Sequence, residues 1–264
     1  MTPPCVVSAP GKVLITGGYL VLDPAYRGLV LGTSARFYAA VQMAAQSSVK
    51  PVPPASDDSV CRLVHVEAPQ FTDASWVYAV QWPDGGDSDW KLVDVTEQYG
   101  YTPGGNPFVE AALRLTLAYA EHGGGGRPWH ERLASGTIKI TMLADNDFYS
   151  QHEQLVARQL PVSRQGLQAL PRFCRTDRRL RDVHKTGLGS SAALTTSLVA
   201  ALLAFLDVCQ PDDADGRRIV HNLAQVCHCY AQGKIGSGFD VSAAADEQGQ
   251  REQICALVAD EQRQ

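Results

Sequence analysis

The residues best suited to chemistry form one stretch, Lys185 to Leu194, which reads KTGLGSSAAL. Gly187 and Gly189 have no Cβ atom, so the backbone can turn there and direct several N–H groups at one point. An apolar run from Leu194 to Leu206 follows and predicts a largely buried helix, whose dipole adds partial positive charge at the same point. Such an arrangement is typical of an anion site, and in a stretch this rich in glycine the usual anion is a phosphate.

The two serines after these glycines, Ser190 and Ser191, admit three roles. Their hydroxyls can cap the helix, bond phosphate oxygens or ligate Mg²⁺. The purely structural alternative is a glycine turn followed by a serine N-cap. The Walker pattern G-x-x-x-x-G-K-[ST] does not occur in the chain. The dinucleotide pattern G-x-G-x-x-G/A does match from Gly187 to Ala192, but the basic segment 178–184 stands where that pattern needs a strand, so the match is accidental.

A lysine near the N-terminus is the second candidate. Lys12 follows the turn-forming pair Pro10-Gly11 and precedes apolar residues 13–15, which predicts that it is held where a strand meets a turn. The structural alternative is a solvated lysine. The pair Gly17-Gly18 before Tyr19 suggests a close backbone approach to a ligand or to another element.

A second glycine-rich loop is predicted near the other end of the chain. Residues 233–242 read GKIGSGFDVS, with three glycines and a serine just before Asp240. The alternatives here are an acid that caps the next helix and, for Lys234, a cation that satisfies a helix C-terminus.

Composition excludes several classes of partner. The chain has 264 residues, enough for one large domain or two small ones, and 23 basic against 28 acidic residues give a net charge of −5 at pH 7. No basic stripe suggests a nucleic-acid partner, and no apolar run reaches the ~20 residues of a membrane span. The seven cysteines are odd in number and irregularly spaced, which indicates reduced thiols. A zinc site at His221, Cys227, His228 and Cys229 lacks a second ligand pair and is not expected.

Periodicity predicts the other elements of the chain. Strands are expected at Cys5–Ser8, Leu29–Leu31, Ala35–Met43, Arg62–Glu67, Trp76–Trp82, Trp90–Val95 and Thr137–Leu143, and further helices at Phe108–Glu121 and Ile219–Gln232. Loop excursions are expected near 44–59, 83–89, 122–128 and 151–182, and the last of these, polar and basic, is expected to be partly ordered.

The chain resembles the GHMP small-molecule kinases, and within them the phosphomevalonate kinases of the fungal and plant type. Five strings carry the resemblance in the family's order, namely APGKVLITGGYLVLD (9–23), NPFVE (106–110), NDFYS (146–150), KTGLGSSAA (185–193) and AQGKIGSGFDV (231–241). The resemblance implies an α+β fold, that of the GHMP-kinase N-terminal domain (ribosomal protein S5 domain 2-like), over residues 1–245. Family members continue into a C-terminal ferredoxin-like domain with a third glycine-rich motif. Residues 246–264 are instead a polar tail, so we expect a truncated form.

The same resemblance implies a reaction and its residues. The reaction is the ATP-dependent phosphorylation of 5-phosphomevalonate to 5-diphosphomevalonate, in the mevalonate route to isoprenoids and sterols. ATP phosphates would be bound by Lys185, Thr186, Gly187, Leu188, Gly189, Ser190, Ser191 and Ala192, with Ser191 as the Mg²⁺ ligand. Lys12 would offset charge on the transferred phosphoryl group. Asp240 would orient Lys12 or a metal-bound water, with base catalysis as its second role. The acceptor would be bound by Lys12, Tyr19, Lys234, Ser237 and Gly238.

Two alternatives remain open on the sequence. One is a non-catalytic fragment of this kinase, and the other is a different GHMP kinase such as mevalonate kinase, against which Gly17-Gly18-Tyr19 and the 231–241 string argue. The expected location is the cytoplasm, with the peroxisome as the alternative, and the sequence carries no indication of oligomeric state. We further expect Lys12 and the 187–191 loop to face one cleft.

Overall fold

The computed structural model describes residues 4–23, 25–44, 59–83, 90–122 and 136–245. Within them one sheet has the strand order β1-β2-β6-β3-β4-β5. The strands are β1 (Cys5–Thr16), β2 (Leu29–Ala44), β3 (Ser59–Glu67), β4 (Ser75–Pro83), β5 (Lys91–Asp94) and β6 (Thr137–Ala144). β3 and β6 run parallel, and the other neighbouring strands run antiparallel.

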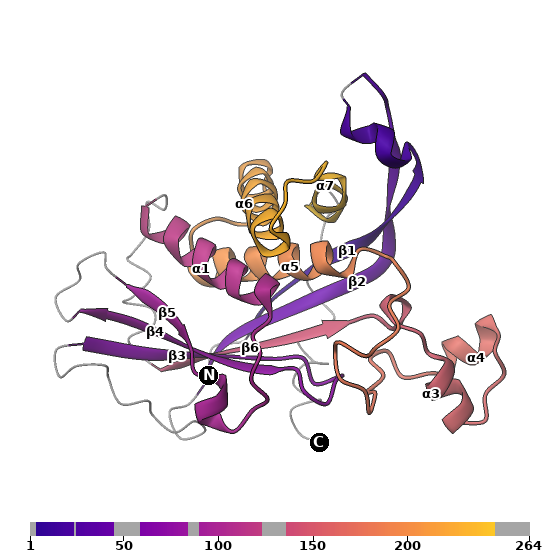
Figure 1. Cartoon of the computed structure of the whole chain (residues 1–264), viewed down its shortest axis with the longest axis horizontal. Coiled ribbons are helices and arrows are strands. Elements are labelled where there is room, and N and C mark those ends of the chain that lie inside the picture. The colour runs from indigo at the N-terminus through magenta and orange to yellow at the C-terminus, as the bar shows by residue number, and fades with distance from the viewer. Residues whose placement is uncertain (1–3, 24, 45–58, 84–89, 123–135, 246–264) are drawn as a thin grey trace.

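Helices cover one face of this sheet, as Figure 1 shows. They are α1 (Pro107–His122), α5 (Ser190–Phe205), α6 (Ala214–Gln232) and α7 (Phe239–Ala245). α5 contacts β1, β2, α1, α6 and α7. Its buried residues surround the whole helix from Ala192 to Leu203, as the continuous apolar run predicts. The expected helices at 108–121, 194–206 and 219–232 are thus confirmed as α1, α5 and α6.

The alternation of side chains along β2 divides the core between the two faces of the sheet. Phe37, Ala39 and Val41 belong to the large cluster beneath the helices. Tyr38 and Ala40 point to the opposite face, where they pack with residues that include Phe173. This second face is therefore covered in part by the chain that follows β6.

The N-terminal strand differs from its prediction. The sequence indicates a strand that ends at Ser8, but β1 continues through Pro10-Gly11 to Thr16, with a register shift against β2 between Pro10 and Lys12. A bulge of this kind interrupts the hydrogen-bond ladder locally, and the strand continues beyond it. Likewise, the two strands expected at 29–31 and 35–43 are one continuous strand, β2. The far ends of β1 and β2 rise away from the body of the molecule (Figure 1) and are joined by the 3-10 helix η1 (Gly18–Leu22).

The segment 151–182 has more regular structure than its composition predicts. It contains α3 (His152–Ala157) and α4 (Arg164–Gln168), which lie beyond one end of the sheet in Figure 1. Leu155, Leu170 and Cys174 form a small buried cluster of its own. Short 3-10 helices η3 (Thr96–Tyr99) and η4 (Asn146–Phe148) complete the described elements.

Other predictions fall partly or wholly outside the described residues. These are the loop excursions expected near 44–59, 83–89 and 122–128, of which residues 45–58, 84–89 and 123–128 are not described, and the whole tail 246–264. Among the residues that are described, no helix has the length and apolar character needed to cross a membrane.

Candidate functional site

The glycine–serine stretch forms a tight loop at the start of α5. Thr186 anchors it, because its N–H donates to the Phe148 carbonyl at 3.1 Å and its hydroxyl donates to the Asp147 carbonyl at 2.6 Å. Gly187 and Gly189 have φ of +88° and +73°, which favours glycine at both positions. Gly189 is the N-cap residue and no side chain caps this helix end. The alternative of a serine N-cap is therefore wrong, and the first-turn N–H groups of α5 have no partners within the helix.

Lys12 lies directly against this loop. Its backbone N–H donates to the Leu188 carbonyl at 2.8 Å. Its side chain crosses Gly189 so closely that a Cβ atom there would stand 2.9 Å from Lys12 Cε. The ammonium Nζ lies 5.0 Å from the centre of the Phe239 ring, a cation–π distance. The structure thus brings Lys12, the loop and the residue before Asp240 to one place.

Gly11 explains how β1 comes so near to this loop. A Cβ atom on Gly11 would stand 2.8 Å from the Leu188 carbonyl oxygen and 2.9 Å from Thr33 Oγ1. Only a residue without a side chain fits between these groups, so Gly11 and the bulge around it bring β1 into contact with the loop.

His228 connects Ser191 to Asp240. Ser191 Oγ lies 3.1 Å from His228 Nε2, Gln232 Nε2 lies 3.1 Å from the same atom, and Asp240 Oδ2 lies 3.9 Å from it. The imidazole is only 3% exposed. Burial lowers the pKa of His228, although the Asp240 carboxylate opposes the shift, so the ring is neutral at neutral pH.

This group is not a hydrolytic triad. In a Ser-His-Asp triad the serine and the acid contact different ring nitrogens. Here both Ser191 and Asp240 approach Nε2. Among the described residues, no group of three or more His, Cys, Asp or Glu side chains has the arrangement of a metal site.

Sequence reasoning missed His228, which was weighed only as a zinc ligand. Its signal lies in the helical pattern: it stands four residues after Ala224 on the buried face of α6. A polar residue on a buried helix face needs a partner from another element.

All the residues predicted to bind the acceptor except Lys12 line one cavity of about 490 Å³. Tyr19, Lys234, Ser237, Gly238 and Asp240 all contribute to its wall. His228, Gln232 and Phe239 also line it, which places Lys12 at its edge through the Phe239 ring. The outer wall stands in solvent, since Tyr19 is 93% and Ile235 is 94% exposed.

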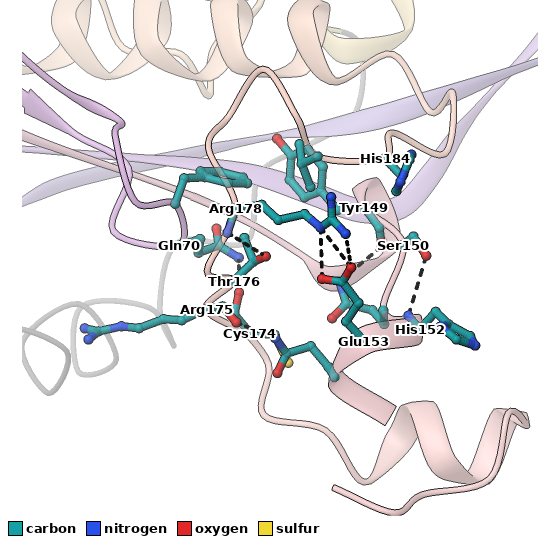
Figure 2. Close-up of a pocket in the computed structure, with 14 residues that line it drawn as sticks. Gln70, Tyr149, Ser150, His152, Glu153, Cys174, Arg175, Thr176, Arg178 and His184 are labelled. Carbon is teal, nitrogen blue, oxygen red and sulfur yellow. Dashed lines mark hydrogen bonds and ion pairs between the residues drawn. The ribbon is translucent and has the colours of Figure 1, made fainter. Parts of the chain in front are cut away.

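A second cavity, of about 310 Å³, opens beside the start of the loop and is shown in Figure 2. Phe71 and Tyr149 line it and meet edge to face at 5.1 Å. An ion pair between Arg178 and Glu153 lies across it, with Arg178 Nε 2.9 and 3.0 Å from the two carboxylate oxygens. Burial raises the pKa of the Tyr149 phenol well above its ordinary value. Tyr149 also forms a β-bridge with Lys185, which joins this cavity to the loop.

Comparison with known proteins identifies close relatives of the chain. Residues 174–247 match the family described as "GHMP kinases N terminal domain". The chain is 42% identical to "Phosphomevalonate kinase erg8" of Aspergillus fumigatus, over 92% of this chain and 50% of that protein. It is 39% identical to "Phosphomevalonate kinase, peroxisomal" of Arabidopsis thaliana, over 90% of this chain and 48% of that protein. The chain therefore spans about half the length of the curated relatives it matches.

Solved structures support the fold alone. The crystal structure of a Lin0012 protein from Listeria innocua matches 92% of this chain and 46% of its own, with a TM-score of 0.50 and 16% identity.

Proposed function

Because the chain has the α+β fold of the GHMP kinase N-terminal domain and is related to phosphomevalonate kinases over half their length, we propose that it carries the ATP-binding part of a phosphomevalonate kinase. The reaction moves the γ-phosphoryl group of ATP to the phosphate of 5-phosphomevalonate, in the mevalonate route to isoprenoids. One observation carries the proposal: the Lys12 side chain lies against Gly189 at the start of α5 and reaches Phe239 at the edge of the acceptor cavity.

The donor side of the proposed site is formed by residues 185–192. Backbone N–H groups at the start of α5 and the helix dipole favour the phosphates of ATP there. The cavity in Figure 2 adjoins Lys185 and offers aromatic side chains, Phe71 and Tyr149, for the rest of the nucleotide. Cavities that combine aromatic walls with a few polar groups are typical of cofactor sites.

The side chains near Ser191 also fit a magnesium ion. Mg²⁺ takes oxygen ligands and usually uses one or two from the protein beside phosphates and water. Ser191 Oγ of α5 and Asp240 Oδ2 of α7 are two such oxygens, 3.1 and 3.9 Å from His228 Nε2. If bound with ATP there, the ion would neutralise charge on the phosphates. We assign Ser191 as its ligand, with Asp240 close by.

Charge and proton balance on the acceptor side follow from the chemistry of phosphates. The second pKa of a phosphate monoester is about 6, so the attacking oxygen is already largely deprotonated at neutral pH. The site therefore needs a cation more than it needs a base. Lys12 supplies that cation between donor and acceptor. Lys234 pairs with the acceptor phosphate, and Asp240 orients Lys12.

The exposed outer wall of the acceptor cavity favours a second candidate function for residues 1–264 taken alone, namely a fragment that binds the nucleotide with little turnover. Tyr19 and Ile235 leave this wall open to water, and the chain matches only half of its relatives' length. A phosphoryl-transfer site needs water excluded and both substrates held in place. Residues 1–264 would then bind the nucleotide and turn over slowly without further residues to close the site.

We expect the protein to act in the cytoplasm, with the peroxisome as the alternative.

Calorimetry with the purified chain tests the donor site. We expect Mg·ATP to bind, and Ser191→Ala to weaken that binding by at least about 10-fold, because the proposed ligand itself is lost and groups behind a metal ligand already contribute this much. The melting temperature should fall only slightly, because the hydroxyl does not cap the helix and its loss removes one contact with His228. A wild-type chain that binds no Mg·ATP overturns the proposal. A large fall in the melting temperature of Ser191→Ala, together with the loss of Mg·ATP binding, would instead assign the hydroxyl to packing.

Acceptor identity is tested separately, by ADP formation in a chain completed with the remaining half of a relative. We expect turnover with 5-phosphomevalonate and little with mevalonate. A preference for mevalonate would assign the chain to the mevalonate kinases.

A further inference from the structure

We propose that His228 is a positioning residue for the cation that accompanies the nucleotide. Its Nε2 accepts the hydrogen of the Ser191 hydroxyl and thereby turns the lone pairs of Ser191 Oγ toward the metal. This inference rests on the proposed function and adds to it a residue that neither the sequence motifs nor the family resemblance assigns.

The geometry around Nε2 supports an acceptor role. Ser191 Oγ and Gln232 Nε2 each lie 3.1 Å from this atom, and both groups carry hydrogens that they can donate. A neutral imidazole with its proton on Nδ1 has one lone pair at Nε2, which these two donors would share. The Asp240 carboxylate is farther away, at 3.9 Å, and its other oxygen accepts the Val241 N–H at 3.0 Å.

The position of His228 makes this contact rigid. The residue is 3% exposed, and its ring lies 5.5 Å from the Phe108 ring of α1. α6 packs against α1, α5 and α7, so the imidazole is held from three sides. A serine at a helix start otherwise rotates freely among three rotamers. A fixed acceptor selects one of them and leaves the oxygen available to a metal. Groups of this kind, behind a metal ligand, commonly contribute about 10- to 100-fold in metal affinity.

The chain offers a matched control on the same helix. His221 Nε2 lies 2.9 Å from Ser242 Oγ, so a second histidine–serine contact joins α6 to α7. Loss of this contact removes a histidine–serine bond between α6 and a neighbouring helix without touching Ser191. An effect that comes only from weakening a histidine contact of α6 should therefore also appear in His221→Phe.

The experiment measures dissociation constants by calorimetry for Mg·ATP and for ATP in excess EDTA. His228→Phe keeps an aromatic ring beside Phe108, although a larger one, and has no acceptor. We expect it to weaken Mg·ATP about 10-fold and to leave metal-free ATP unchanged. His228→Gln restores an acceptor at the distance of Nε2 and should return the Mg·ATP affinity to near the wild-type value. His221→Phe should change neither constant.

Several outcomes overturn the inference. One is an equal weakening of Mg·ATP and metal-free ATP in His228→Phe, and another is the same loss in His221→Phe. If His228→Phe does not fold, His228→Asn decides in its place, because its amide is too short to reach Ser191 and should weaken Mg·ATP where His228→Gln does not. A wild-type chain that binds no Mg·ATP refutes the proposed function, whereas wild-type binding with unaffected His228 variants refutes only the role of His228.

Discussion

The glycine–serine loop at the start of α5 (residues 187–191) and the predicted acceptor cavity meet at Lys12, but they differ in how far the surrounding chain buries them. Behind the loop, α5 is buried on all sides, and Leu198 and Leu203 have no exposed surface. Around the cavity, η1 and the loop after α6 stand in solvent, and Tyr19 and Ile235 are almost fully exposed. Among the described residues, the loop at the start of α5 therefore has buried support, whereas the predicted acceptor cavity has an inner wall and no cover.

The largest expected effect tests this difference in residues 1–264 as a separate polypeptide. They should bind Mg·ATP, yet form ADP with 5-phosphomevalonate on the order of 10³-fold more slowly than a complete phosphomevalonate kinase, because an open cavity loses the effective molarity of two held substrates. A coupled ADP assay beside calorimetry measures both. Robust turnover by a soluble monomer would show that the cavity needs no further cover.

Lys12→Ala should have the next largest effect, because Lys12 is the point where the two halves join. In a chain completed with the other half of a relative, we expect turnover to fall by about 10²-fold, the usual effect of removing a preorganised charge stabiliser. Lys91→Ala on the edge strand β5 is the control and should leave turnover unchanged. Wild-type turnover in Lys12→Ala would make Lys12 an ordinary solvated lysine.

Two glycine substitutions compare the two halves by stability. Gly189 has a φ of +73°, and a Cβ atom there would meet the Lys12 side chain. Gly189→Ala should lower the free energy of unfolding by about 1–2 kcal/mol, the cost of a left-handed conformation in a residue with a Cβ atom. Gly236 in the cavity wall has open space around it, so Gly236→Ala should change that free energy by no more than about 0.5 kcal/mol. Urea denaturation of both variants measures the difference, and equal values would contradict it.

The smallest expected effect concerns the exposed wall alone. Ile235→Ser removes an apolar side chain that is 94% exposed, so the melting temperature should hardly change. Self-association should decrease, because exposed apolar groups at one site promote contacts between molecules. Light scattering at increasing protein concentration measures this effect. A large drop in melting temperature would show that Ile235 packs within the chain.

Local sequence signals predicted the glycine loop and the buried helix α5 well. The two glycines with positive φ and the apolar run after Ser191 act over a few residues, so a pattern reveals them. The path of β1 through Pro10-Gly11 could not be read in this way, because it depends on space beside the Leu188 carbonyl far along the chain.

The sequence also failed to predict features that form where several helices or strands meet. The role of His228 depends on α5, α6 and α7 converging on one nitrogen. The order in 151–182 depends on contacts such as those of Asn146 with the Pro171 carbonyl and the Cys174 N–H, at 2.7 and 2.9 Å. The composition of that segment carries no trace of them.

The position of β6 has a consequence for how the chain folds. β6 lies between β2 and β3, although it is synthesised after β3, β4, β5 and α1. The hairpin β1–β2 and the meander β3–β4–β5 are local units that can form early, but each keeps an unpaired edge until β6 joins them. Closing such sequence-distant pairs is slow, with rates typical of milliseconds to seconds. During synthesis on the ribosome, these two open edges are therefore where we expect the nascent protein to be most vulnerable to misassembly and to depend on chaperones.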